Sequence, residues 1–405
     1  MLVSIILASY NRYPFILYSL YALENQNFDL SKMEVILVDD ASSDQTPFLK
    51  YYDPPYAFKY IRNKKNAGLA ATRNRGLENA KGRVIIFLDA EMLVDPNYVR
   101  NNYRHHLKNK NSVVIGDKVR RLYTFICPGF NERQIKEVNS LLIKRAIVKK
   151  RLSTMVDKNT KLEDISPIVN HLKHPLQILD KRDIQHFSSL RAFSTPKKDL
   201  TRILSQLGPD FEKSPIAWMA CFGNLSLRKS LVKKVGGFDA DFKKWGEEDR
   251  DFAYRLYKEG ALFIVDKDLK RYHQEHLESS NKKKEGKTNK LLLQKKHPEL
   301  NVSIRALKYI QKLDYDFLNK IVQEDHTLFS DFPGQFEEFK RAIVLMLQQI
   351  YILKSENKKV KNVLKHSGIQ NNPLKREQIF KERDQVESLG KYPNLIKLFD
   401  ILTNK

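Results

Sequence analysis

The sequence has only two cysteines, Cys127 and Cys221, among its 405 residues. Two cysteines cannot form the disulfide framework of a small secreted domain, and these two lack the spacing of a zinc site. We expect both to be buried thiols in a protein of a reducing compartment. Glycine and proline are also scarce, at 15 residues each, which excludes a collagen-like or low-complexity chain.

Long hydrophobic runs are missing as well. The most apolar stretch, 342–353, is shorter than the roughly 18 to 20 residues that span a bilayer, and it contains Gln348 and Gln349. The first twelve residues lack the basic start of a signal peptide and are predicted to begin with a strand. These features favour a cytoplasmic location and leave room for peripheral contact with the inner face of the membrane.

Acidic residues are too few to balance the basic ones. Lys and Arg number 72 against 48 Asp and Glu, which gives a formal net charge of +24. This excess favours anionic partners, such as nucleic acid, an acidic membrane face or a phosphate-bearing polymer or metabolite. The hydrophobic fraction of 41% and the length suit one large domain and a smaller one.

The first 125 residues alternate between strand and helix patterns. Strands are predicted at 2–8, 34–40, 58–61, 83–89 and 112–116, and helices at 14–25, 68–80 and 96–107. This alternation predicts a mostly parallel sheet with helices on both faces. Ligands of such sheets bind beyond the carboxyl ends of the strands, so polar residues there are expected to face one crevice.

The rest of the chain differs in pattern. Residues 126–213 are predicted to be a basic, helical insert, in which 139–151 is one amphipathic helix that covers the core or lies on an acidic membrane face. A strand is predicted at 261–265. A lysine-rich linker at 278–287 then separates a first domain, 1–277, from a helical domain, 288–405.

Two pairs of carboxylates follow predicted strands. Asp89 and Glu91 can both point at one divalent ion, and Mg²⁺ or Mn²⁺ is typically held by one or two carboxylates together with substrate phosphates. The alternative is a pair of solvated loop carboxylates. Asp39 and Asp40 could accept hydrogen bonds from a base or a ribose, or could cap a helix.

Three further motifs carry candidate chemistry. Small residues and Arg73 at the start of the helix 68–80 suit a diphosphate, although close helix packing explains them too. The acidic run after Trp245 suits either a general base at a helix N-terminus, beside an aromatic ring for a sugar, or simple complementation of the helix dipole. His273 and His276, placed just after a strand, could supply a further metal ligand or be structural.

Seven motifs occur in one order along residues 1–276: VSIILASYN, VDDASSDQT, NAGLAATRNRG, DAE, GNLSLRKSLVKKVGGFD, WGEEDRDFAYRL and YHQEH. Together they resemble a family 2 glycosyltransferase, and the insert is the least typical part. The family's usual metal triplet is Asp-x-Asp, and Glu91 stands at its last position here. The GGFD and WGEED stretches also resemble the acceptor end of animal galactosyltransferases.

The resemblance implies a GT-A fold, an α/β architecture with a mostly parallel sheet, here with a helical insert and a C-terminal helical domain. It implies a nucleotide-sugar site made of Ala8, Ser9, Tyr10, Asp39, Asp40, Asn66, Gly68, Arg73, Asp89 and Ala90. It implies Mn²⁺ or Mg²⁺ held by Asp89, Glu91, His273 and His276, and an acceptor site with Trp245, Gly246 and Asn224, next to Gly223. Asp249 would be the catalytic base, with Glu248 beside it.

The implied activity is inverting, metal-dependent transfer of a hexosyl or N-acetylhexosaminyl group from a nucleotide sugar, with UDP the expected nucleotide. The expected acceptor is a glycan, a lipid-linked intermediate or an anionic cell-surface polymer, as in polysaccharide biosynthesis at the cell envelope. The C-terminal helices could form a homo-oligomer. The alternatives are a nucleotidyltransferase, a protein that binds nucleic acid or an anionic polymer without catalysis, and a non-catalytic scaffold. No nucleic-acid-binding motif is present, so nucleic acid is not the expected partner.

Overall fold

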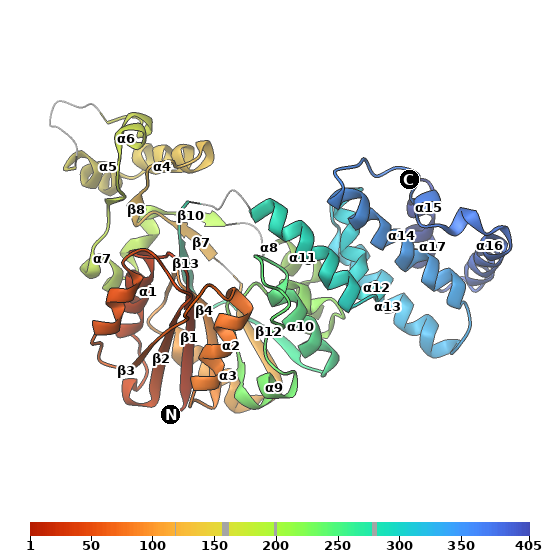
Figure 1. Ribbon diagram of the computed structural model, residues 1–405, viewed down its shortest axis with the longest axis horizontal. Helices are drawn as coiled ribbons and strands as arrows, with labels where there is room; N and C mark the ends of the chain where they lie inside the picture. The colour runs from red at the N-terminus through yellow and green to blue at the C-terminus, as the bar shows by residue number, and fades with distance from the viewer. Residues whose placement is uncertain (118, 156–161, 198–200, 278–281) are drawn as a thin grey trace. The chain divides into compact units, whose positions relative to one another are not determined.

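The computed structural model describes residues 1–117, 119–155, 162–197, 201–277 and 282–405 (Figure 1). The chain divides into two compact units. The first unit consists of 1–202, 221–243 and 252–280, and the second of 203–220, 244–251 and 281–405.

The centre of the first unit is a seven-stranded sheet with the order β12-β6-β11-β4-β1-β2-β3. Neighbouring strands are parallel except β11, which is antiparallel to β4 and β6. The continuous apolar runs form these strands because both faces of the sheet are buried, as in β1 and β2. The strands are β1 (Val3–Ser9), β2 (Met33–Asp39), β3 (Ala57–Arg62), β4 (Val84–Asp89), β6 (Ser112–Gly116), β11 (Leu225–Arg228) and β12 (Leu262–Asp266). The predicted strands and the mostly parallel α/β architecture are confirmed.

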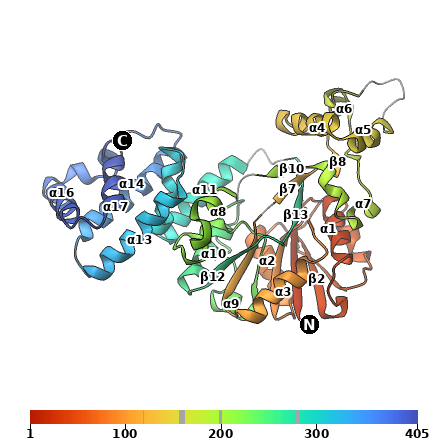
Figure 2. The same cartoon turned by 180° about the vertical axis from the view of Figure 1, so that it is seen from behind.

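Helices flank this sheet, as the two opposite views in Figures 1 and 2 show. They are α1 (Phe15–Glu24), α2 (Leu69–Asn79), α3 (Tyr98–Lys108), α9 (Lys229–Lys234) and α10 (Glu248–Lys258). Close contact between α2 and β1 depends on Gly76, because a Cβ there would lie 2.4 Å from the Cγ2 atom of Ile6. The helices predicted at 14–25, 68–80 and 96–107 are confirmed.

A second, four-stranded sheet has the order β10-β7-β13-β5. Its strands are β5 (Met92–Val94), β7 (Val119–Leu122), β10 (Ser194–Lys197) and β13 (Arg271–Gln274). The prediction that the histidine motif follows a strand is wrong, because Tyr272 and His273 lie within β13 itself. Strands of three or four residues with mixed polarity are too short to show a period, so they were not predicted.

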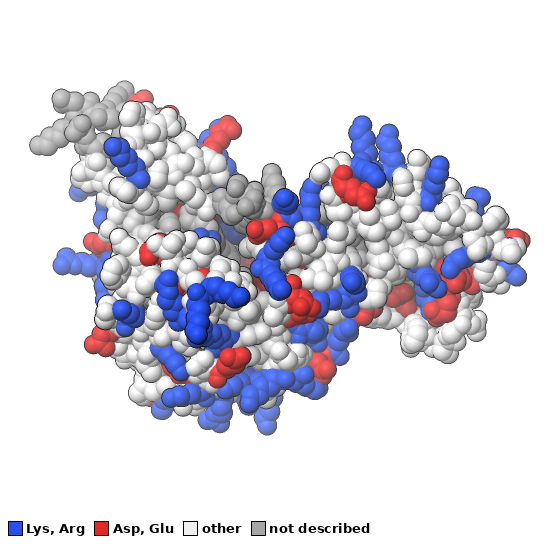
Figure 3. All heavy atoms as spheres, viewed as in Figure 1, with Lys and Arg blue, Asp and Glu red and all other residues white. Residues whose placement is uncertain are grey.

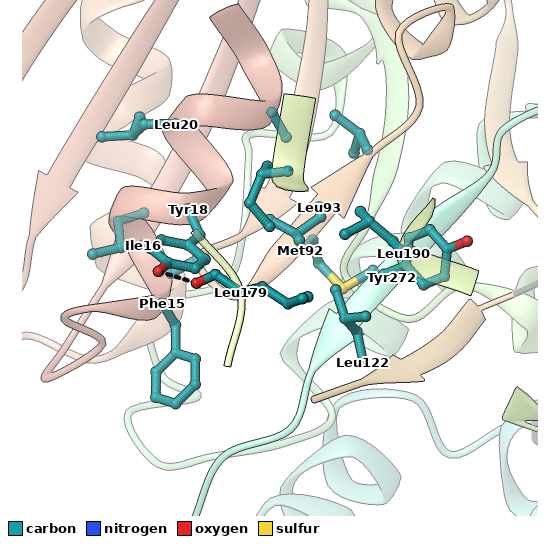
Figure 4. Close-up of a cluster of buried hydrophobic side chains, with 14 of the residues drawn as sticks. Phe15, Ile16, Tyr18, Leu20, Met92, Leu93, Leu122, Leu179, Leu190 and Tyr272 are labelled. Atoms are coloured by element: carbon teal, nitrogen blue, oxygen red, sulfur yellow. Dashed lines mark hydrogen bonds between the residues drawn. The ribbon is translucent and has the colours of Figure 1, made fainter. Parts of the chain in front are cut away.

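A large apolar cluster lies between α1 and the second sheet. The Tyr18 hydroxyl donates a hydrogen bond to the Leu179 carbonyl (2.6 Å), which ties α1 to the insert. Figure 4 shows this pair together with Phe15, Ile16, Leu20, Met92, Leu93, Leu122, Leu190 and Tyr272. Cys127 belongs to the same cluster, and both cysteines are buried thiols that form no disulfide.

The insert contains strands as well as helices. Its elements are β8 (Phe125–Ile126), α4 (Glu132–Lys144), α5 (Ala146–Ser153), α6 (Ser166–His171), β9 (Leu176–Gln177), α7 (Lys181–Gln185), β10 and α8 (Thr201–Leu207). The prediction of one helix over 139–151 is wrong, because Arg145 is extended (φ −132°, ψ 101°) and separates α4 from α5. The break brings Val148 and Leu152 into the same buried cluster as Val138.

The second unit is built almost wholly of helices. They are α11 (Lys282–Lys296), α12 (Leu300–Ser303), a 3-10 helix (Ile304–Tyr309), α13 (Tyr315–Asp331), α14 (Glu337–Ser355), α15 (Val363–His366), α16 (Pro373–Ser388) and α17 (Pro393–Thr403). Within the described ranges, no helix combines the length and the apolarity needed to cross a bilayer.

Two predicted boundaries need correction. The second unit is larger than 288–405, because Trp218 is fully buried in it and its indole N–H donates to the Asn301 side chain (2.9 Å). The predicted linker 278–287 begins with residues outside the described ranges, and from Lys282 onward the chain is helix α11. Lysine and glutamate are good helix formers, so a lysine-rich stretch does not by itself mark a linker.

Candidate functional site

The carboxyl ends of β1, β2 and β4 meet at one edge of the main sheet. The strand register pairs Ala8 with Asp89 and Ser9 with Asp39, so the predicted polar residues are aligned there. Ser9 is buried, and its hydroxyl has no hydrogen-bond partner among the described residues. An unsatisfied buried hydroxyl at a strand end is consistent with a ligand that completes the site. Tyr10 follows directly and is 48% exposed.

Asp39 organises the turn after β2. Its buried carboxylate accepts hydrogen bonds from the Ser42 N–H (2.8 Å), the Tyr60 hydroxyl (2.6 Å) and the Arg62 guanidinium (2.7 Å). Burial, followed by the hydrogen bond to Asp39, raises the pKa of Tyr60 to about 12, so the hydroxyl remains a donor. Asp39 therefore supports the site through its neighbours.

Asp40 holds the loop that precedes α2. Its carboxylate accepts from the Asn63 side chain (2.7 Å) and from the backbone N–H groups of Ala67 (2.8 Å) and Gly68 (3.0 Å). A carboxylate offers about four acceptor positions, so at most one remains for a base. The loop presents Asn66 to solvent. The contact of Asp40 with a nucleotide base stays a prediction.

Gly68 could not be another residue without distortion. Its φ is +86°, and a Cβ there would lie 2.6 Å from the carbonyl oxygen of Lys243. Glycine is the residue that adopts this conformation without a steric penalty. The loop thus passes close to the segment that follows β11 and α9.

Asp89 at the end of β4 is fixed by two side chains from distant segments. Arg73 on α2 is buried and donates to one carboxylate oxygen (2.9 Å), and the Asn224 amide donates to the other (2.7 Å). Asn224 also accepts the backbone N–H of Asp89 (2.8 Å). Gly223 makes room for this arrangement, since a Cβ there would lie 2.8 Å from the Arg73 guanidinium. Ala90, the next residue, is buried.

Glu91, His273 and His276 form a candidate metal centre. Their ligand atoms lie within 4.8 Å of one another, and the Glu91 Oε1 atom is 3.7 Å from His273 Nε2 and 3.4 Å from His276 Nε2. The antiparallel pairing of β13 with β5 places His273 opposite Met92 and thus beside Glu91. Of the four predicted metal residues, the structure brings these three together, whereas the Asp89 carboxylate is outside the group and is bound by Arg73 and Asn224.

Each imidazole has an acceptor group on the side away from Glu91. The Nδ1 atom of His276 hydrogen-bonds the Leu277 carbonyl (2.7 Å), and that of His273 lies 3.4 Å from the Glu275 carboxylate. A carbonyl or carboxylate behind a metal-binding histidine typically sets its tautomer and leaves the other nitrogen as the ligand. A carboxylate with two such nitrogens therefore fits a divalent ion.

Glu275 is a residue that the sequence reasoning missed. Arg133 donates to its carboxylate (2.7 Å), and Arg121 lies 3.8 Å away. Burial alone would raise its pKa, but the neighbouring His273 and the hydrogen bond from Arg133 lower the pKa of Glu275 to about 2. Glu275 lies between the two histidines of the YHQEH motif, and this position is the sequence feature that could have identified it.

Glu91 carries a negative charge for similar reasons. Burial would raise its pKa, but the neighbouring His276 and the Arg12 guanidinium hold the pKa of Glu91 well below its usual range. Arg12 Nε lies 3.6 Å from the Glu91 Oε2 atom, which leaves Oε1 directed toward the histidines.

Of the predicted acceptor and base residues, Asn224 belongs to the first unit, whereas Trp245, Gly246, Glu248 and Asp249 belong to the second. Trp245 is 50% exposed, and its backbone N–H donates to the Glu285 carboxylate (3.2 Å). The side chain of Asn289 donates to the Gly246 carbonyl (2.6 Å), where φ is +96°. Glu248 and Asp249 lie in the first turn of α10, with Glu248 buried and Asp249 partly buried. The segment before α10 is therefore held by α11.

Glu247 was also missed by the sequence reasoning. It has a left-handed backbone (φ +71°) and is buried, and its carboxylate accepts two hydrogen bonds from Arg305 (2.9 and 3.3 Å). Burial would raise its pKa, but the charges of Arg305 and Arg250 hold the pKa of Glu247 well below its usual range. Only its pairing with Arg305, which is distant in sequence, distinguishes Glu247 from the two acidic residues that follow it.

The chain matches two known families. Residues 4–159 match the family described as glycosyl transferase family 2, and residues 204–277 match the N-terminal domain of galactosyltransferase. The uncharacterised glycosyltransferase YfnE of Bacillus subtilis is 25% identical over 360 residues, which cover 87% of this chain and 84% of YfnE. The chondroitin synthase of Pasteurella multocida is 27% identical over 67% of this chain, but the match spans only 24% of that protein.

Among solved structures, that of S. aureus TarS 1–349 in complex with UDP-GlcNAc matches 99% of this chain and 92% of its own. The TM-score is 0.46 and the sequence identity is 14%.

Proposed function

The chain is a family 2 glycosyltransferase, and from this premise we propose that it transfers a hexosyl or N-acetylhexosaminyl group from a UDP-sugar to an acceptor hydroxyl with inversion. The observation that carries this proposal is the grouping of Asp89, Arg73 and Asn224 at the carboxyl ends of the parallel strands. That edge is where ligands of such sheets bind. Donor, metal and acceptor roles then fall to different parts of the chain.

In the proposed donor site, the strand ends and the loop before α2 bind the nucleotide. The unsatisfied Ser9 hydroxyl, with Ala8 and the exposed Tyr10, lines the base and ribose. Asp39 and Asp40 hold the neighbouring turn and loop, which carry Asn66 and Gly68. Arg73 is buried beside Asp89, so its guanidinium is oriented before the diphosphate arrives.

In the proposed metal site, Glu91, His273 and His276 hold Mn²⁺ or Mg²⁺. Asp89 lies two residues before Glu91 and faces the same nucleotide. A bound divalent ion would neutralise charge on the leaving diphosphate. The chain's own contribution is to fix the three ligands, through the Glu275 carboxylate behind His273 and the Leu277 carbonyl behind His276.

For the acceptor, we propose that Asp249 takes the proton from the attacking hydroxyl, with Glu248 beside it, while Trp245 and Gly246 contact the acceptor sugar and Asn224 borders the reacting groups. A half-exposed indole suits the apolar face of a sugar. Attack on the anomeric carbon from the side opposite the leaving diphosphate, without a covalent enzyme intermediate, inverts its configuration. The relative named a chondroitin synthase supports a polymer as acceptor.

The test is a panel of nucleotide sugars with purified full-length protein and Mn²⁺, scored for nucleotide release and for thermal shift. We expect one UDP-sugar to be turned over and a chelator to abolish the turnover. Asp249→Asn should remove transfer but keep UDP binding, whereas Asp89→Ala should weaken UDP binding. The control is Asp268→Asn, which changes an exposed carboxylate on a turn. Failure of every nucleotide sugar to bind, with or without metal, would overturn the proposal.

A further inference from the structure

Four basic side chains gather around the buried Glu247 carboxylate in the second unit. We call Arg250, Lys290, Arg305 and Lys308 the basic cluster. They come from the first turn of α10, from α11 and from the 3-10 helix that follows α12. Lys and Arg also outnumber Asp and Glu on the face shown in Figure 3, but most of those side chains are solvated. The basic cluster differs because it is partly buried.

The Glu247 carboxylate is already used by two members of the basic cluster. Arg305 binds both Glu247 oxygens (2.9 and 3.3 Å), and Arg250 lies 3.6 Å from one of them. Neither Lys290 nor Lys308 forms a salt bridge within the ranges that the structure describes. The Asp249 carboxylate also acts on Arg305 electrostatically, so four basic groups face two carboxylates and outnumber them.

The basic cluster is partly buried, and burial disfavours the charged form of its side chains. Arg305 is only 7% exposed. Burial first, and then repulsion by Arg305 and Lys290, lower the pKa of Lys308 to about 6. Burial and the neighbouring arginines also lower the pKa of Lys290. Isolated cations in such surroundings cost stability, and the cost is recovered when an anion binds.

An unused donor and a pair of rings border the basic cluster. The Tyr351 hydroxyl is buried and has no hydrogen-bond partner among the described residues. The Lys308 ammonium lies 5.7 Å from the centre of the Tyr351 ring and 5.1 Å from that of Tyr309. The rings hold the ammonium in position but carry no charge, so they do not neutralise it.

The basic cluster adjoins the proposed acceptor residues. Asn289, next to Lys290, donates to the Gly246 carbonyl, and Glu247 follows Gly246 directly. A Cβ built on Gly286 of α11 would lie 3.7 Å from the Trp245 ring and 4.0 Å from the Lys290 ammonium. The indole and the ammonium therefore border the same point of α11.

We propose that the basic cluster binds a phosphate group of the acceptor, next to the sugar-binding Trp245. This inference rests on the proposed function, whose acceptor it narrows to phosphate-bearing molecules. Arginine and lysine together suit phosphate, since a guanidinium makes paired hydrogen bonds and an ammonium adds a point charge. A lone carboxylate such as that of a uronic acid would need only one of the four cations. The phosphate could be a diester in a soluble polymer or one in a lipid headgroup.

The test uses the full chain saturated with UDP and Mn²⁺, so that the donor site is filled. Isothermal titration with glycerophosphoglycerol, a soluble phosphodiester, is compared with glycerol and with glucuronate. We expect the phosphodiester to bind and glycerol and glucuronate to bind at least tenfold more weakly. Equal binding of glucuronate, or no binding of the diester in solution or in vesicles, would overturn the proposal.

The variant for this test is Lys290→Met with Lys308→Met. We expect at least a tenfold loss of phosphodiester affinity together with a higher melting temperature, because two poorly solvated amino groups are removed. Lys290→Arg with Lys308→Arg keeps the charge and should restore binding, which guards against a fold defect. The matched control is Lys359→Met with Lys361→Met, which changes two exposed lysines of the same unit. Unchanged affinity in the first variant would overturn the proposal.

Two further binding experiments distinguish a phosphate in a soluble polymer from one in a lipid headgroup. Vesicles of phosphatidylglycerol carry the same diester as a lipid headgroup, and phosphatidylcholine vesicles are their control. Binding to soluble diester indicates a polymer phosphate, and binding to phosphatidylglycerol vesicles alone, lost in the Met variant, indicates a lipid-linked one. UDP-sugar turnover without any phosphate binding would overturn this inference alone. Phosphate binding without UDP-sugar binding would instead count against the proposed function.

Discussion

Glu247→Gln is the substitution that probes the second unit most directly. The glutamine keeps the size and the left-handed backbone of Glu247 but removes the charge that Arg305 binds at 2.9 and 3.3 Å. Arg305 is 7% exposed, so water cannot replace the lost partner. Removing one member of a buried pair costs about 3–5 kcal/mol. The three other members of the basic cluster lose the same neutralising charge, so the upper half of that range is expected.

Denaturation monitored by circular dichroism and by calorimetry measures this cost. At about 2–4 °C per kcal/mol for a unit of this size, the transition of the second unit should fall by roughly 10 °C or more. The control is Glu356→Gln, which breaks the exposed pair with Lys358 (2.8 Å) and should cost less than about 1 kcal/mol. Added phosphate should restabilise Glu247→Gln more than the wild type. A cost equal to that of the control would refute the reasoning.

Three further predictions follow from particular contacts. Gly68→Ala should destabilise the first unit and weaken UDP binding at least tenfold. Gly236→Ala is the control: it has a similar φ of +76° but nothing within 4 Å, so it should show only the backbone strain. Equal effects of the two substitutions on melting temperature and on UDP affinity would contradict this prediction. Glu275→Gln should weaken Mn²⁺ binding about tenfold in titration calorimetry because His273 loses the carboxylate behind it, and an unchanged Mn²⁺ affinity would count against the metal site. The pKa of Lys308 is lowered to about 6 in the folded protein, so between that pH and the ordinary lysine pKa the unfolded chain binds more protons than the folded one. Stability should therefore rise with pH across this window, and the gain in melting temperature from Lys308→Met should shrink from pH 6.5 to 9.5. A gain that does not change with pH would contradict the assignment.

The main sheet could be predicted from the sequence because its strands are continuous apolar runs. In β1, β2 and β4 nearly every residue is buried on one face or the other, so burial follows from composition alone. Polar residues directly after such runs must then lie at the carboxyl edge. For this reason Asp39 and Asp89 could be placed at the site without knowledge of any long-range contact.

The metal centre needed the tertiary structure. His273 lies beside Glu91 because the four-residue β13 pairs with the three-residue β5, and strands so short leave no readable period. The orienting carboxylate of Glu275 likewise depends on Arg133 from the insert. The sequence could nominate the histidines, but it could not separate Asp89 from the group that the structure brings together.

The extent of the second unit was also decided by tertiary packing. Trp218 and Glu247 precede the C-terminal helices in sequence, yet each finds its hydrogen-bond partner there, in Asn301 and Arg305. A local sequence pattern indicates which side chains prefer water or the protein interior, and at what spacing the apolar residues recur. It does not indicate which distant group will satisfy a buried indole N–H or carboxylate, because that partner is set only when the segments pack together.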